Sequence, residues 1–462
     1  MTFLIWFVPI FISLNALISA WVGFLGFQLS PCLLLLSLIF TILISASHAK
    51  TGLSPKVGPL AEPIRKGPTF QESIRRLLFT ICLITFLFLL YSLKDLVLPP
   101  GDDPLFHLDL IKKLLATGNL PPGTNYPAGM HLNLFLFASL FKLDLIATAN
   151  LMAIVTVFLL SFFPFGFFLF INQLFLDSRR SLPRMLRGGN DQYLAVCRDE
   201  SHRLAFFASI STIPFLPNFI HNFGMGSHPF LWGLFLAPFF LASFFRLFSI
   251  SRHPECSPDP QVVDGVEGSL GNRFLHSGRN DGGKNQVLKQ ILITVLLAFG
   301  LFYTHPSWGI TSALIIFFLL PAILGFQKAS PCASARGGLE KVLAKLIAFT
   351  LLLSITLLPM LSSVINMLAA RANTTPLGNQ WAEFDSGRFN SLKEAFLSLV
   401  NLFQLRGNLF FTFMFGLGLV LIVISVFPKR SLLCRCKGET FQKFSIMLFF
   451  LTLVFIFFDA GY

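Results

Sequence analysis

An acidic pair followed by a histidine forms the part of this sequence best suited to chemistry. Asp102 and Asp103 stand near the start of a polar stretch at 98–130, and His107 follows Asp103 at the i+4 spacing of a helix. A carboxylate there can act as a general base or bind a divalent cation. Asp103 before Pro104 also fits a helix start, because Asp caps free N–H groups and Pro suits the first helical position. Asp103 therefore has two interpretations, whereas Asp102 is not needed for a cap.

Histidines in later polar segments join this pair, because the topology below brings them to the same side of a membrane. These outer-face histidines are His107, His131, His221, His228 and His305. Ionisable groups at a membrane boundary cost free energy and usually line a cavity or an interface with a function. We therefore expect one site on that side.

Composition predicts a polytopic membrane protein. Of the 462 residues, 54% are hydrophobic and 12% are charged, and the mean hydropathy is +0.72. Soluble domains carry about 25% charged residues, so the charges here are too few to cover a globule. The net charge of +13 is explained by basic cytoplasmic loops, and no nucleic-acid partner is expected. No cysteine falls in a predicted outer loop, so disulfides are not expected.

The expected fold is all-α, a transmembrane bundle of about 11 spans with a helical first large outer loop. Spans are predicted at 3–22, 29–47, 77–97, 145–175, 204–220, 229–249, 289–303, 307–326, 346–364, 409–427 and 444–458. Basic loops at 48–76 and 177–203 place the N-terminus in the cytoplasm and the loop 98–130 outside. The expected location is the cell membrane, with an extracytoplasmic site.

The run 131–175 is too long for one span and is interrupted by Lys142 and Asp144. Because the flanking segments must lie on opposite sides, an odd number of crossings is required. We therefore predict a short re-entrant or interfacial segment at 131–143 and a span at 145–175.

The outer loop itself predicts a surface helix over about 104–117 that ends at Gly118. Its apolar face would hold Leu108, Ile111 and Leu115, with His107 and Lys113 elsewhere. Such a helix is expected to lie along the membrane surface.

Four parts follow from this topology: a hairpin of two spans at 1–47, a transmembrane core at 77–364 that contains the outer loop, an outer polar segment at 365–408 and C-terminal spans at 409–462. The abrupt end of the sequence indicates either a naturally short chain or a missing C-terminal part.

Short polar motifs of the core carry a resemblance to a known class of enzymes. After the acidic pair and His107 come Gly-Asn-Leu-Pro at 118–121 and Tyr-Pro-Ala-Gly-Met-His at 126–131. This order resembles the GT-C class of polytopic glycosyltransferases, in its bacterial and archaeal branch with an Asp…His, G-x-(I/L)-P and YP-x-G-x-H outline. The segments 224–229 and 304–307 look like the outer loops of that branch. The likeness covers about residues 77–326, and an extra pair of spans precedes the first acidic loop.

The resemblance implies transfer of a sugar from a polyprenyl-phosphate-linked donor in the membrane to a lipid, glycan or protein acceptor on the extracytoplasmic face. Asp102 or Asp103 would take the acceptor proton. Negative charge grows on the leaving phosphate, so it needs positive charge or a metal. A divalent cation (Mg²⁺ or Mn²⁺) held by the acidic pair is left open. The substrate-binding residues implied are His107, Tyr126, His131, His228, His305 and Arg371.

Two alternatives remain open. A transporter or flippase of an envelope precursor would place polar residues near the bilayer midplane, often in two related halves. Here the charges cluster in predicted outer loops and no repeat is found, although prolines interrupt several spans. A non-catalytic envelope-assembly protein would use Asp103 only as a cap, and Asp102 and His107 would then tolerate alanine.

Overall fold

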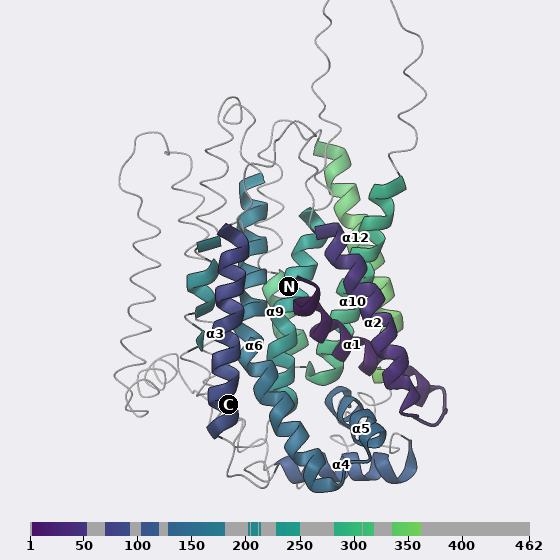
Figure 1. Ribbon diagram of the computed structural model, residues 1–462. Coiled ribbons are helices and arrows are strands. Elements are labelled where there is room, and N and C mark those ends of the chain that lie inside the picture. The colour runs from purple at the N-terminus through teal and green to yellow at the C-terminus, as the bar shows by residue number, and fades with distance from the viewer. Residues whose placement is uncertain are drawn as a thin grey trace, which may run out of the picture.

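The described part of the chain is all-helical (Figure 1). The computed structural model describes residues 2–52, 70–92, 103–119, 128–180, 202–203, 205–210, 212–213, 228–249, 281–306, 308–317 and 335–361. No strand occurs within these ranges, which confirms the all-α prediction for them. The outer polar segment at 365–408 and the C-terminal spans lie outside the described residues.

The main helices of the described ranges follow in chain order. They are α1 (Thr2–Phe24), α2 (Cys32–Gly52), α3 (Phe70–Ser92), α4 (Asp103–Thr117), α5 (Gly129–Phe141), α6 (Leu145–Arg180), α9 (His228–Ser249), α10 (Asp281–Thr304) and α12 (Ala335–Thr356). Five of the described helices contain a segment long and apolar enough to cross a membrane: Ile5–Phe24, Glu72–Tyr91, Leu145–Gln173, His228–Leu247 and Gln286–Thr304. Shorter apolar helices occur at the predicted spans 29–47, 307–326 and 346–364.

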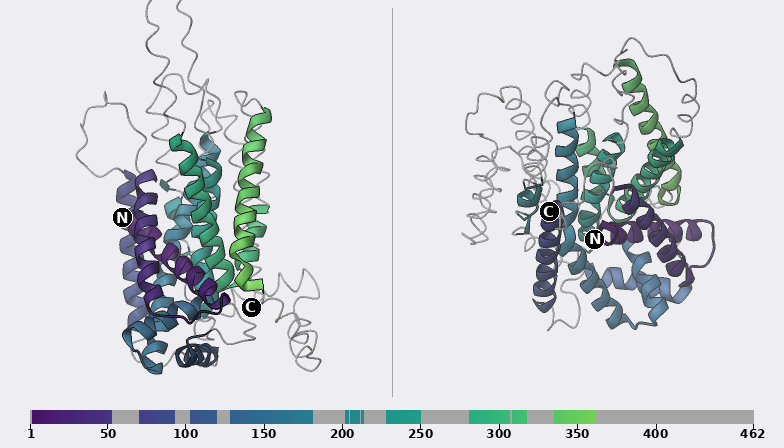
Figure 2. Two further views of the ribbon diagram at one scale, coloured as in Figure 1. Left: turned by 90° about the vertical axis from the view of Figure 1, so that its right-hand side faces the viewer. Right: turned by 45° about the horizontal axis from the view of Figure 1, so that its top comes forward.

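The long helices run side by side, and α4 and α5 lie across one end of them (Figures 1 and 2). Helix α6 packs against α3 and α9, and α10 packs against α1, α9 and α12. The pairs Phe79–Phe162 and Phe86–Phe158 show that α3 and α6 are antiparallel, so α3 ends where α6 begins. The end that holds α4 and α5 is called the α4 end below.

The run 131–175 is divided where the sequence predicts. Helix α5 has 13 residues, too few for a hydrocarbon core of about 30 Å. Lys142 then adopts a left-handed conformation with φ of 51°. Asp144 begins the next helix, since its carboxylate accepts a hydrogen bond of 2.7 Å from the Ala147 backbone N–H. The long helix α6 follows as one continuous element.

Buried amides fix α1 against α5. The side chain of Asn15 donates to Asn133 Oδ1 at 2.9 Å. Asn133 in turn donates to the carbonyl oxygens of Gly129 at 2.8 Å and of Ile12 at 3.2 Å. Since buried polar groups are costly without partners, these bonds specify one position of α5 along α1.

A close contact between backbones joins α1 to α10. A Cβ atom added at Gly300 would lie 2.1 Å from Ser13 Oγ and 2.8 Å from Ser13 Cα. Only a residue without a side chain allows this approach, because the second of these atoms belongs to the backbone and cannot rotate away.

We predict that Gly300→Ala destabilises the protein by about 1–3 kcal/mol, because α1 and α10 must separate to admit the methyl group. Thermal unfolding of the purified chain in detergent measures the loss. The double variant Ser13→Gly with Gly300→Ala should recover part of it. A Gly300→Ala variant as stable as the wild type would show that the helices are not this close.

Candidate functional site

Helix α4 forms as the sequence predicts and is anchored at its C-terminal end. It runs from Asp103 to Thr117, and Gly118 follows with a φ of 64°. The Gly118 carbonyl accepts a hydrogen bond of 2.8 Å from the Leu29 backbone N–H in the loop between α1 and α2. Of the predicted apolar face, Leu108 and Ile111 are buried. The anchor therefore fixes where the opposite end of α4, with Asp103, lies.

His107 belongs to the buried face of α4, so its predicted place off that face is wrong. The side chain is 3% exposed, and its Nδ1 lies 3.0 Å from Nε2 of His131, which is fully buried in α5. One ring donates and the other accepts, so each can remain neutral while the bond is satisfied. The prediction failed because the partner that draws His107 inward lies on another helix.

His228 enters a second network at the start of α9. Its Nδ1 lies 3.0 Å from Thr156 Oγ1 of α6, and the Trp232 indole N–H donates to the same oxygen at 3.0 Å. Thr156 donates its hydroxyl hydrogen to the Met152 carbonyl at 2.8 Å. His228 Nδ1 must then carry a hydrogen to bond this oxygen, which makes Nε2 the basic nitrogen of the neutral ring.

The two networks are neighbours. A charge on His107 would disfavour a second charge on His131 or on His228. Burial lowers the pKa of His107 to about 4, and burial together with His107 holds the pKa of His131 well below 6.5. The rings of His107 and His131 are therefore neutral at pH 7 and act as hydrogen-bonding groups rather than as cations.

His305 lies at the same end of the bundle, beside the first turns of α9. Its ring meets Phe230 edge to face at 5.3 Å, and its Cβ would be 2.9 Å from a Cβ added at Gly233. Burial lowers its pKa to about 4. A further close approach links this segment to α5, since a Cβ at Gly129 would lie 2.9 Å from the Tyr303 carbonyl oxygen.

The structure thus brings together segments that are far apart in the sequence. His107 bonds to His131, His228 bonds to Thr156 at the start of α9, and His305 lies beside the first turns of α9. Asp103 is the first residue of α4, although its side chain is not described. Asp102, Tyr126, His221 and Arg371 lie outside the described residues.

No group of three potential metal ligands occurs in the described ranges. The predicted cation site at Asp102 and Asp103 cannot be placed from them. The rings of His107, His131 and His228 and the Thr156 hydroxyl are buried, and their bonds link α4 to α5 and α6 to α9.

Sequence reasoning missed Thr156 and Trp232. Thr156 stands within a predominantly apolar run that gives no sign of its partner. Trp232 follows His228 at i+4, and this spacing was the available signal.

Comparison of the chain with known protein families, with curated proteins and with solved structures gives no match. Its function is therefore argued from the arrangement at the α4 end and from the motifs that supply it.

We predict that the protein loses stability as the pH falls from 6.5 towards 4. A histidine of the unfolded chain takes up a proton near pH 6.5, whereas folded His107 does so only near pH 4. The unfolded state therefore binds more protons in this interval, and His107 alone contributes a loss of about 3 kcal/mol. Chemical denaturation at several pH values measures it. His107→Gln should show a shallower dependence, and an unchanged slope would contradict the assignment.

Proposed function

We propose that this chain is a multi-pass membrane glycosyltransferase that uses a sugar on a polyprenyl phosphate, with its site at the α4 end. One observation carries the proposal. The histidines of four separate polar motifs, His107, His131, His228 and His305, lie at the same end of the bundle where α4 begins with Asp103. A transferase that recognises a lipid-linked substrate needs such a polar site at the boundary of its apolar helices.

The distribution of exposed apolar side chains supports insertion into a membrane. Helix α3 exposes Phe88 by 70% and Ile84 by 61%, and α12 exposes Leu351 by 61% and Ile355 by 55%. Soluble proteins rarely expose large contiguous apolar patches. In a bilayer the same faces contact lipid tails.

In this proposal, the carboxylate of Asp102 or Asp103 is the general base that removes the proton from the acceptor group. Asp103 lies at the N-terminus of α4, where free backbone N–H groups stabilise a carboxylate. As the sugar leaves its carrier, negative charge grows on the phosphate oxygens. Hydrogen bonds from His107, His131 and His228, together with Tyr126, His305 and Arg371, are proposed to hold the donor. A divalent cation at the acidic pair would supply the additional positive charge.

We propose that the reaction takes place on the extracytoplasmic side of the cell membrane. The basic segments 48–76 and 177–203 follow α2 and α6 in the sequence, and both helices end away from the α4 end. The acceptor is then a hydroxyl or amide group of a lipid, glycan or protein.

One group of polar side chains deep in the bundle joins α9 to α10. Gln290 of α10 donates to Ser243 Oγ of α9 at 2.9 Å, and Ser243 Oγ lies 2.8 Å from Thr294 Oγ1. These groups satisfy one another across a helix contact. They therefore stabilise the packing of α9 against α10.

We predict that Asp102→Asn or Asp103→Asn lowers transfer at least about 100-fold, since an amide cannot accept the proton. The assay offers the purified wild-type chain a panel of polyprenyl-phosphate sugars together with membrane-extract acceptors and follows transfer of labelled sugar.

Glu72→Gln is the matched control, because Glu72 is an exposed carboxylate at the other end of α3 that pairs with Arg76. It should retain full activity. Transfer that survives both substitutions in folded protein would contradict the assigned base. If the His107→Gln variant were also fully active, the proposed location of the site at the α4 end would be wrong.

A further inference from the structure

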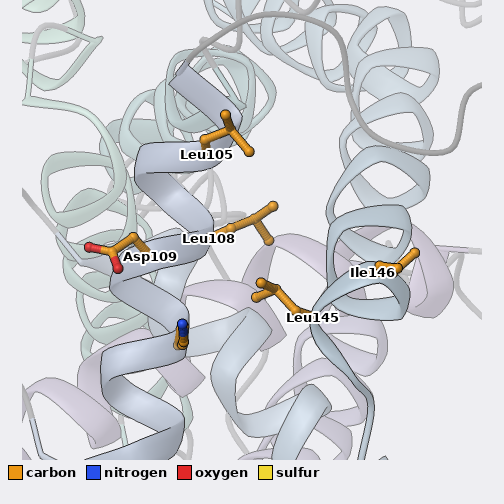
Figure 3. Close-up of a pocket in the computed structure, with 6 residues that line it drawn as sticks. Leu105, Leu108, Asp109, Leu145 and Ile146 are labelled. Carbon is orange, nitrogen blue, oxygen red and sulfur yellow. The ribbon is translucent and has the colours of Figure 1, made fainter.

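A shallow groove lies between α4 and the first turn of α6 (Figure 3). It encloses ≈ 250 Å³ and is lined by Leu105, Leu108, Asp109, Lys112, Leu145 and Ile146. In Figure 3, Leu108 and Leu145 point toward one another from the two helices. The α4 residues follow a spacing of i, i+3, i+4 and i+7, so they form one stripe of that helix.

The walls of this groove are apolar yet exposed. Leu105 is 57% exposed, Ile146 53% and Leu145 41%. Leu145 is also the first residue of the apolar segment Leu145–Gln173. The groove therefore opens where the hydrocarbon of a bilayer would meet its headgroups, and water is not the solvent that suits its walls.

One cation lies at this groove without an ion pair in the described part of the chain. The neighbouring Lys113 binds Asp109 at 2.7 Å, which neutralises the carboxylate that lines the groove. Lys112, which also lines it, makes no such pair within the same ranges. Apolar walls with one positive charge at the side match a lipid chain with a phosphate headgroup.

The size of the groove favours a lipid over a protein segment. An α-helix is about 10–12 Å across with its side chains, and pockets for drug-sized ligands hold about 300–1,000 Å³. The groove, at ≈ 250 Å³, is too small for either. Part of one hydrocarbon chain can lie along it, while the rest of the chain stays in the bilayer.

We propose that this groove binds an anionic phospholipid of the surrounding bilayer, with one acyl chain against Leu108 and Leu145 and the phosphate on Lys112. The bound lipid fills the space between α4 and α6 and stabilises the position of α4. This site does not depend on glycosyl transfer, because only insertion of the chain into a membrane is required.

Native mass spectrometry of the purified full chain tests the proposal. Phosphatidylglycerol and phosphatidylcholine with identical chains are added separately, and the lipid-bound fraction is measured. The wild type should retain more phosphatidylglycerol. Lys112→Gln should weaken that binding about fivefold, the expected effect of one lysine near an anionic headgroup, and leave phosphatidylcholine unchanged. Ile146→Trp should fill the groove and reduce binding of both lipids.

Lys142→Gln is the control. Lys142 is an exposed lysine in the turn before α6, so the substitution removes the same charge at the same end but does not alter the groove lining. Equal phosphatidylglycerol binding by Lys112→Gln and wild type would overturn the proposal. So would an equal loss in Lys142→Gln, or no preference of the wild type for phosphatidylglycerol. Lys112 is exposed, so its substitution decides the question even if Ile146→Trp fails to fold.

Discussion

The hydrogen bond between His107 and His131 is the interaction on which the arrangement of the α4 end depends. It joins α4, which is too polar to cross a membrane, to α5, which is too short to cross one. Neither helix can be held by the bilayer alone. Both rings are buried, so the bond also satisfies groups whose desolvation would otherwise be costly. The contact needs one ring nitrogen without a hydrogen, so protonation of both rings would remove the acceptor and break it.

The helices beneath this contact are fixed by close approach and by buried amides. Asn133 locks α5 to α1, while Gly129 allows the start of α5 to meet the end of α10. Gly300 allows α1 and α10 to touch. The Asn133 hydrogen bonds and the close contacts at Gly129 and Gly300 each form in only one register of the helices. Together they determine that the α5 histidine faces the α4 histidine, and this geometry positions the beginning of α4 for the proposed chemistry.

Local features of the fold were predictable from the sequence because they depend on near neighbours. The start of α4 at Asp103, its end at Gly118 and the break at Lys142 and Asp144 follow from caps, glycine and chain length. The burial of His107 was not predictable, since its cause is a ring 24 positions later on another helix. The role of Thr156 was not predicted for the same reason, because its partners His228 and Trp232 lie on another helix. The gathering of the histidine segments at one end came from topology, because alternate helix ends share a side.

The buried histidines have an observed role in the fold and a separate, proposed role in the reaction. The neutral, hydrogen-bonded rings explain how the α4 end is held together, and the same groups are proposed to orient a donor phosphate. The proposed role of His107 in donor binding therefore depends on the same bond that holds α4 against α5. A change that breaks the ring pair should displace the N-terminus of α4 together with Asp103, whichever carboxylate takes the proton.

A double-mutant cycle on His107 and His131 tests the central claim most directly. The free energies of unfolding are measured for the wild type, His107→Phe, His131→Phe and the double variant at neutral pH. The account predicts a favourable coupling of about 1 kcal/mol or more, because either single substitution already removes the bond. Strictly additive losses would contradict it, since they would mean that the two rings do not hold α4 against α5.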